Sequence, residues 1–544
     1  MMFKQNLKMK KLLYSSLVLS TIVVYSGDQF STLSPQPAIQ KQSTSNMTIL
    51  NQTYVTLDLS VLHDKNSFTD QDSVVLHLDS NREIILYVKK ISHQKNVDNF
   101  TWIGKNDKEN INAIFSIRNG KLVGTIQIDT ETYKIVPVGD IYKIEKMDTS
   151  KIRPFHGDDI LETVKEISSR VNTSTTKEIN TLEATTSVET SVDVMLLYTA
   201  GFQLANGEAT VAAVQNLFDI AQNAYTASLT DVNLNLVYVG QVPATSTLNN
   251  TSNLYNTLSD LASNGYVQHQ RTQYNADIVS LIGQFFLESN NCGLGRKPYT
   301  LGSKMTDAFS VTLNGRDSGY YCSDLTLAHE IGHNFACNHD ADHAGSTTMY
   351  TYGYGYDVAS KFATVMSYDN PEIHYFSNPN IIDIPSGLAI GNASNADNAR
   401  VIRNNKLEMA NNSDEVDESL EVGDTKSALE IDAYLSTKID RDSYVVNLGG
   451  PTTFSADNVG YGCWYFYINL YDEEYNLVFS SDANSGSGCD ATDQVVLENG
   501  TYKMMVFNNG WNAGNNQHYL IGIDTEYVEP IKALSPAIIS YILN

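Results

Sequence analysis

Three histidines and a glutamate stand close together between positions 329 and 339. His329 and His333 are four residues apart, so on a helix their imidazoles project from one face, about 40° apart and one turn above each other. Two imidazoles in that arrangement can bind the same metal ion. Glu330 directly follows His329, close enough to contact a water on that ion without being a ligand itself. The spacing therefore predicts metal-dependent hydrolysis with Glu330 as the general base.

His339 is the third candidate ligand, and it requires the helix to end before it. Six residues past His333, its side chain would point about 240° away if the helix continued. A glycine normally makes the necessary turn because the turn needs a positive φ, but this sequence has Ala336 there. Alanine in that conformation costs roughly 1–2 kcal/mol, which a folded domain tolerates. Three neutral imidazoles leave the fourth position of a tetrahedral Zn²⁺ open to water, so we expect one catalytic zinc ion.

The segment HEIGHNFACNHD at 329–340 resembles the elongated zinc motif of the metzincin metalloendopeptidases. Asn334, Phe335 and the trailing Asp340 look like the reprolysin (adamalysin)-like branch, particularly its secreted bacterial members. The resemblance implies an enzyme that hydrolyses peptide bonds. It also implies the zinc ligands and the general base, which are the four residues already singled out: His329, His333, His339 and Glu330.

A second segment resembles the Met-turn that lies beneath the zinc ion in metzincins. This segment is FATVMSY at 362–368, and IHYFSNP at 373–379 resembles the sequence that follows the turn in the bacterial enzymes. Met366 would then support the site, and Asp340 would anchor it without being a ligand. Tyr368 stands two residues after the methionine, as in astacin- and serralysin-type metzincins, where a tyrosine binds zinc as a further ligand and stabilises the oxyanion. A packed aromatic side chain is the alternative for Tyr368.

The chain from 188 to 412 has the pattern of one α/β domain. Apolar runs such as 192–198 and 277–283 predict strands, and an apolar period over 208–226 predicts a helix between them. Strands separated by helices imply a sheet with parallel pairing. Both runs, and NADNARVIRNN at 395–405, resemble elements of the bacterial enzymes. The resemblance implies a metzincin-like α/β (α+β) catalytic domain, in which a twisted sheet lies over long helices.

The N-terminal residues predict export and a separate β domain. Residues 1–26 combine a lysine-rich start with a short apolar run, which predicts a signal peptide and a secreted, extracellular protein without a membrane span in its mature form. Residues 27–187 alternate apolar and polar side chains and end in a Thr/Ser-rich linker, which predicts a β-rich domain. Residues 99–148 resemble the propeptide of secreted bacterial metzincins. The resemblance implies a zymogen that is inhibited by its own propeptide.

The C-terminal residues predict a third domain. An acidic linker at 413–425 precedes renewed alternation at 426–526, which predicts a β-sandwich, and the tail at 527–544 stays unassigned. The sandwich weakly resembles the pre-peptidase C-terminal domain of secreted bacterial peptidases. Acidic loops such as 472–474 fit Ca²⁺ binding and plain solvation alike, so calcium stays open.

Five cysteines fit an oxidising compartment, where disulfides form. Cys463 and Cys489 make a natural pair in the last quarter of the chain. Cys292, Cys322 and Cys337 cannot all pair among themselves. We favour the pair Cys292 and Cys322 with Cys337 free, although spacing alone does not settle the choice.

The charge and the motif together define the hypotheses on function. The chain has 36 Lys and Arg against 62 Asp and Glu, a net charge of −26, which argues against nucleic acid or anionic lipid as the main partner. The leading hypothesis is a secreted zinc endopeptidase that acts on proteins or peptides and is made as a latent precursor. One alternative is an adhesin or binding protein whose metzincin fold has lost catalysis, with Ala336 as the sign. Another is a metal-dependent hydrolase of a non-peptide amide.

Overall fold

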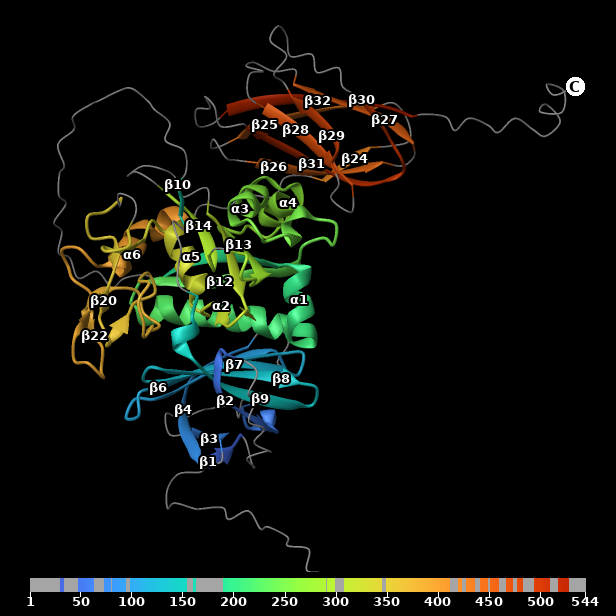
Figure 1. Ribbon diagram of the computed structural model, residues 1–544. Helices are drawn as coiled ribbons and strands as arrows, with labels where there is room; N and C mark the ends of the chain where they lie inside the picture. Colours follow the sequence, from blue (N-terminus) through green and yellow to red (C-terminus); the bar gives the residue numbers. More distant parts are fainter. Residues whose placement is uncertain are drawn as a thin grey trace, which may run out of the picture.

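The computed structural model arranges the chain in three successive parts, which Figure 1 shows from bottom to top. The predicted signal peptide, the linker at 172–187, most of the acidic linker, the tail beyond Tyr527, and the expected pair of Cys463 and Cys489 lie outside the described residues. None of the helices in the described part of the chain has the length and apolar character needed to cross a membrane. The structure describes residues 30–33, 47–62, 73–79, 81–93, 98–153, 160–162, 189–289, 291–298, 308–344, 349–410, 419–422, 427–435, 441–448, 451–458, 466–472, 477–482, 494–508 and 517–527.

The first part is a nine-stranded sheet with the order β1-β3-β4-β5-β6-β7-β8-β9-β2. Strands β1 and β3 are parallel and the other neighbours are antiparallel. Asn119 and Gly120 both have a positive φ and close the hairpin between β6 and β7, as this residue pair does in tight hairpins. The strands are β1 (Phe30–Thr32), β2 (Ile49–Val55), β3 (Ser73–Asp79), β4 (Arg82–His93), β5 (Phe100–Asn106), β6 (Ile111–Arg118), β7 (Lys121–Ile128), β8 (Glu131–Val138) and β9 (Ile141–Met147), with short helices η1 (Leu59–Leu62) and η2 (Thr149–Lys151).

The second part is built on a six-stranded sheet with the order β10-β14-β15-β13-β11-β12. Neighbouring strands are parallel except β14 and β15, so the expected parallel pairing is present. The strands are β10 (Ile160–Glu162), β11 (Thr190–Tyr198), β12 (Val232–Gln241), β13 (Ile278–Gln284), β14 (Gly293–Lys297) and β15 (Phe309–Asn314). The helices are α1 (Ala200–Asn206), η3 (Gly207–Ala209), α2 (Thr210–Ala227), η4 (Thr247–Asn249), α3 (Leu254–Ser263), α4 (Gly265–Gln273), α5 (Thr326–Asn334) and α6 (Asn398–Met409).

Helices cover both faces of this sheet because successive side chains of a strand point to opposite faces. On β11, Val192, Val194 and Leu196 belong to the core that contains α2 and α5. Met195 and Leu197 belong to the core on the other face, which contains α3 and α4. Helix α5 therefore lies under the sheet, against β14 and β15 near one edge. Figure 1 shows α2 on the same side, between the six-stranded sheet and the nine-stranded sheet.

Short ribbons and a β-sandwich complete the chain. The two C-terminal sheets share one core, in which Phe454 and Phe479 meet edge to face. The ribbons of the second part are β16 (Arg316–Asp317) with β17 (Tyr320–Tyr321), β18 (Asn338–Asp340) with β19 (Tyr354–Gly355), β20 (Asp357–Val358) with β21 (Phe362–Ala363), and β22 (Asn378–Ile382) with β23 (Ala389–Ile390). The C-terminal strands are β24 (Ser419–Val422), β25 (Ser427–Leu435), β26 (Arg441–Leu448), β27 (Thr452–Asn458), β28 (Phe466–Tyr471), β29 (Leu477–Asp482), β30 (Gln494–Leu497), β31 (Gly500–Asn508) and β32 (Gln517–Tyr527).

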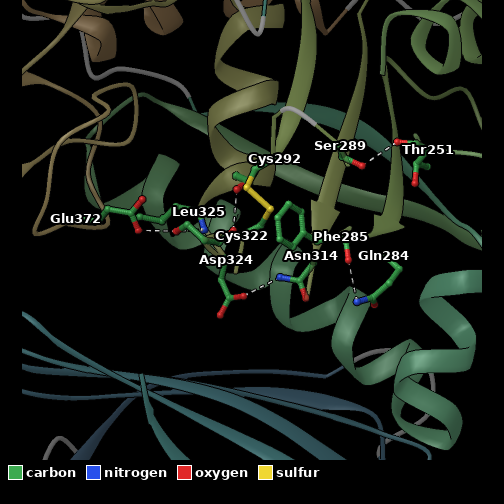
Figure 2. Close-up of a disulfide and its surroundings, with 12 residues drawn as sticks. Thr251, Gln284, Phe285, Ser289, Cys292, Asn314, Cys322, Asp324, Leu325 and Glu372 are labelled. Atoms are coloured by element: carbon green, nitrogen blue, oxygen red, sulfur yellow. Dashed lines mark hydrogen bonds between the residues drawn. A yellow bond between two sulfur atoms is a disulfide. The ribbon is translucent and has the colours of Figure 1, made fainter. Parts of the chain in front are cut away.

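A disulfide joins Cys292 to Cys322, the pair that the sequence analysis favours, and Cys337 is a buried free thiol. Cys292 directly precedes β14, and Cys322 lies shortly before α5. Figure 2 shows this bridge beside the segment that leads through Asp324 and Leu325 into the helix. The disulfide therefore ties strand β14, which lies next to the edge strand β10, to the segment just before α5.

Removing this disulfide should destabilise the protein. A Cys292→Ser, Cys322→Ser double variant should lose about 3–4 kcal/mol of unfolding free energy, because 30 residues separate the two cysteines and the bridge restricts that loop in the unfolded chain. Urea denaturation under non-reducing conditions measures the loss. An unfolding free energy equal to that of the unmodified protein would contradict the prediction.

Candidate metal centre

Helix α5 places the side chains of His329 and His333 next to each other. The helix is buried along its whole length, and His329 and His333 lie one turn apart with their ring centroids separated by 4.8 Å. Their Nε2 atoms are 3.1 Å apart. The local sequence thus forms the helix that the four-residue spacing requires, and the surrounding core excludes water from its side chains.

The helix ends immediately after His333, in the turn that the sequence predicts at Ala336. Ala336 has a φ of 73°, in the left-handed region, although it is not glycine. Its N–H donates to the carbonyl of His333 (2.8 Å), and the N–H of Cys337 donates to the carbonyl of Gly332 (3.0 Å). These two bonds form a Schellman motif, which reverses the chain at a helix end. The next residues can therefore run back toward the helix.

The reversal brings His339 to the other two histidines. His339 lies on β18, and its Nε2 is 3.0 Å from Nε2 of His333. One nitrogen from each of the three rings lies within 4.8 Å of the others, and all three side chains are buried. The structure therefore brings the three predicted ligands together around one point.

Backbone carbonyls orient two of the imidazoles. Nδ1 of His329 lies 2.7 Å from the carbonyl of Val365, and Nδ1 of His333 lies 3.0 Å from the carbonyl of Cys337. A carbonyl only accepts, so each Nδ1 carries the proton and each Nε2 presents a lone pair. Two lone pairs that face each other at 3.1 Å repel, and a cation between them offsets this repulsion. Two nitrogens at about 2.0–2.1 Å from a tetrahedral zinc ion would lie about 3.3 Å apart, so this donor set fits zinc.

Two glycines let strand β14 approach Glu330, the predicted general base. Glu330 is fully buried, and a Cβ atom on Gly293 would overlap its carboxylate. A Cβ on Gly295 would lie 2.8 Å from the Glu330 carbonyl oxygen and 3.0 Å from Cβ of His333. Strand β14 can therefore lie directly against α5 only because these positions lack side chains. The sequence analysis missed both residues, and the Gly-x-Gly spacing directly after Cys292 was the available signal.

Residues 362–368, the predicted Met-turn segment, pack against helix α5. Met366 is fully buried, and a Cβ on Gly332 of α5 would lie only 2.7 Å from its Sδ. Asp340 joins this segment to β18, because its N–H donates to the Met366 carbonyl (3.1 Å) and its Oδ2 accepts from Ser367 Oγ (3.1 Å) and the Tyr368 N–H (3.2 Å). The Asp340 side chain is thus an anchor beside the histidines, outside the ligand set.

Tyr368 lies at the edge of the third histidine. Its hydroxyl is 2.7 Å from Nε2 and 2.9 Å from Nδ1 of His339, and the two ring centroids are 4.3 Å apart. The hydroxyl therefore points to the histidine cluster, while the ring also packs against His339. The structure accommodates both interpretations of this tyrosine.

Two further titratable groups lie between the Met-turn segment and the nine-stranded sheet. Burial raises the pKa of Glu372 to about 7, although the hydroxyl of Ser323 donates to its carboxylate. Burial lowers the pKa of His374 to about 4. At neutral pH the His374 ring is therefore neutral, and the Glu372 carboxyl group is divided between its neutral and charged forms.

Comparison with known proteins agrees with this geometry. Residues 188–377 match the family Reprolysin_5, described as Metallo-peptidase family M12. The chain is 28% identical over 308 residues to a peptidyl-Asp metalloendopeptidase of Stenotrophomonas maltophilia, which covers 55% of this chain and 70% of that protein. A protein of the same name from Xanthomonas campestris pv. campestris is 27% identical over 309 residues, with 55% and 70% covered. Another from Pseudomonas aeruginosa is 30% identical over 247 residues, with 40% of each covered. The family match and these relatives support a zinc metalloendopeptidase.

The turn at Ala336 provides a direct test of the metal centre. Ala336→Gly should retain metal affinity within about threefold, because glycine adopts a positive φ without strain. Ala336→Val should lower affinity at least about tenfold, because a β-branched residue at this φ is strained and moves His339 away from the cluster. Competition with a zinc-binding dye measures both variants. Equal affinity in the valine and glycine variants would show that the turn does not position His339.

Proposed function

We propose that this chain, whose residues 188–377 form a metallopeptidase domain of the M12 type, is a secreted zinc endopeptidase made as a latent precursor. The observation that carries the proposal is the convergence of three buried imidazoles beside a buried carboxylate. His329, His333 and His339 would hold the ion, and Glu330 stands next to them on the same helix. Secretion is supported by the pattern of residues 1–26 and by the disulfide, which suits an oxidising compartment.

Each residue of the site can be given a role in the hydrolysis of a peptide bond. A Zn²⁺ ion held by the three imidazoles would lower the pKa of a water and polarise the scissile carbonyl. The Glu330 carboxylate accepts a proton from that water and then delivers it to the departing amine, so that the amine leaves neutral. Burial of Glu330 beneath β14 keeps bulk water away from this proton transfer. Met366 and Asp340 hold the Met-turn segment against the histidines.

The edge of β14 is the proposed binding site for a peptide substrate. An extended peptide can add to a sheet edge through its main-chain hydrogen bonds, and β14 lies against the helix that carries Glu330 and His333. The relatives share the name peptidyl-Asp metalloendopeptidase. Peptide bonds next to aspartate are therefore the first substrates to test on this chain.

Occupation of the same edge supports latency. Strand β10 pairs in parallel with β14, with Ile160 opposite Gly295 and Glu162 opposite Lys297. β10 precedes the Thr/Ser-rich linker and belongs to the predicted propeptide. A substrate strand on this edge of β14 would have to displace β10, so the N-terminal region acts as an inhibitor in this proposal.

The charge of Glu330 should be essential for activity. Glu330→Gln keeps the size of the side chain but removes the general base, so kcat should fall by about 10²–10⁴ while zinc content stays at one ion per chain. Hydrolysis of denatured casein and of an aspartate-containing peptide by the processed enzyme measures the loss. Glu288→Gln, an exposed glutamate in the same domain, is the matched control.

Removing the metal ion from the unmodified enzyme should also abolish peptide hydrolysis. A chelator should stop hydrolysis and added zinc should restore it. Activity that persists in Glu330→Gln would contradict the role of this residue, and activity that resists the chelator would contradict the metal-dependent mechanism.

Tyr368→Phe distinguishes the two interpretations of this tyrosine. If the hydroxyl stabilises the oxyanion, the variant should lose about tenfold in kcat with KM nearly unchanged, because the interaction forms only in the transition state. Steady-state kinetics at equal zinc content measure the split. An unchanged kcat would leave Tyr368 as a packing residue for His339.

A further inference from the structure

Helix α2 has a polar face that the nine-stranded sheet covers. Val214, Phe218 and Ala221 lie on one side of the helix and belong to the core beneath the six-stranded sheet. Gln215 and Asp219 lie on an adjacent face of the helix, about 100° round from these residues, and are also buried. The helix packs against β6 and β7 on that side, between the two sheets, as Figure 1 shows.

Asp219 is at the centre of this contact. Its Oδ2 accepts hydrogen bonds from Thr101 Oγ1 (2.6 Å) and Ser116 Oγ (2.5 Å) of the nine-stranded sheet, and its Oδ1 accepts one from Gln215 Nε2 (2.9 Å). Arg118 is buried nearby and donates to the Phe100 carbonyl at 2.8 Å. Burial raises the pKa of Asp219, whereas these hydroxyls and the Arg118 charge act in the opposite direction. The buried carboxylate therefore receives two of these three hydrogen bonds from the nine-stranded domain.

Asn216 makes a second buried contact one residue from Gln215. Its Nδ2 donates to the Ile114 carbonyl (3.1 Å) and to Ser116 Oγ (3.2 Å). Its Oδ1 accepts from Thr125 Oγ1 (3.1 Å). The amide is thus bonded at both ends to β6 and β7, and it fixes the register of the helix on the sheet.

Ion pairs flank these buried contacts. Lys134 Nζ of β8 lies 2.7 Å from Asp324 Oδ1, and Arg316 Nη2 lies 2.5 Å from Glu145 Oε2 of β9. Figure 2 shows Asp324 directed from the catalytic domain toward the strands of the nine-stranded sheet. The catalytic domain therefore contributes Asp219, Asn216 and Asp324 to the contact, and each is bonded to a group of the nine-stranded domain.

From this arrangement we infer that the nine-stranded domain remains bound to the catalytic domain after the chain between them is cut. The polar face of α2 is the binding surface, the partner is the released N-terminal fragment of the same chain, and Asp219 sets the affinity. Apolar side chains of the nine-stranded sheet add to the contact, since Ile114 belongs to the core around α2 and Ile103 and Val123 pack against that core. Cleavage alone therefore leaves a latent non-covalent complex; this last statement rests on the proposed role of the N-terminal region as an inhibitor.

The test uses the full chain with a site-specific protease sequence inserted after Thr176. After cleavage the two fragments should elute together from a gel-filtration column at neutral pH, and a dilution series followed by analytical ultracentrifugation gives their dissociation constant. Asp219→Ala should raise this constant about 30-fold or more, because it leaves two buried hydroxyls without their acceptor and removes the negative charge near the buried Arg118. Asp260→Ala, an exposed carboxylate on α3, should leave it unchanged within about threefold.

Variants on the other side of the contact keep the test valid if Asp219→Ala does not fold. Ser116→Ala and Thr101→Val lie in the nine-stranded domain, so they leave the catalytic domain intact. Each should raise the dissociation constant about tenfold in the unmodified background. Ser116→Ala should change it much less than tenfold once Asp219 is alanine, because the bonded pair is already broken.

The experiment measures the association of the two fragments separately from the inhibition of peptide hydrolysis. Fragments that part at once after cleavage, or variants of Asp219 and Ser116 that bind as tightly as Asp260→Ala, would overturn the inference even if the precursor is latent. Fragments that stay together but hydrolyse peptide at the full rate would uphold the binding surface and contradict latency. Co-elution with activity that appears only on dilution below the dissociation constant would support both.

Discussion

The metal centre depends on one reversal of the chain. Helix α5 supplies two imidazoles, but a third from a continuing helix would point away, so the site exists only because Ala336 accepts a left-handed conformation. The same turn does a second task, since it places the Cys337 carbonyl where it fixes the proton on His333. The turn at Ala336 therefore determines both where His339 lies and which nitrogen of His333 carries the proton. Packing of the core around α5 stabilises this turn although its residue is alanine.

The sequence predicted the parts of the site that local geometry determines. The four-residue spacing of His329 and His333, the need for a turn at Ala336 and the convergence of His339 all follow from helix geometry, and the structure contains each of them. The parallel sheet and the alternating N-terminal domain were also predictable, because periodicity reports which side chains are buried.

The missed features depend on contacts between distant segments. Gly293 and Gly295 matter because β14 passes over Glu330, and no local pattern states which strand will lie on which helix. The polar face of α2 shows the same limit. Its glutamine, asparagine and aspartate suggest a solvated surface, and they are buried only because β6 and β7 supply matching hydroxyls and carbonyls. Sequence periodicity separates apolar from polar faces, but it does not separate a polar face in water from one against another domain.

The two glycines of β14 also bear on how selective the proposed substrate site on this strand would be. Where Gly293 and Gly295 lie, the strand presents amide and carbonyl groups and no side chain, so a neighbouring chain is held there by features that every polypeptide shares. The structure shows a segment of the protein itself, β10, paired with this strand, and in the proposed function a substrate peptide would take the same place. Selectivity among substrate sequences would then depend on side chains of the loops beside β14. Those loops can change without a change in the residues proposed to carry out hydrolysis.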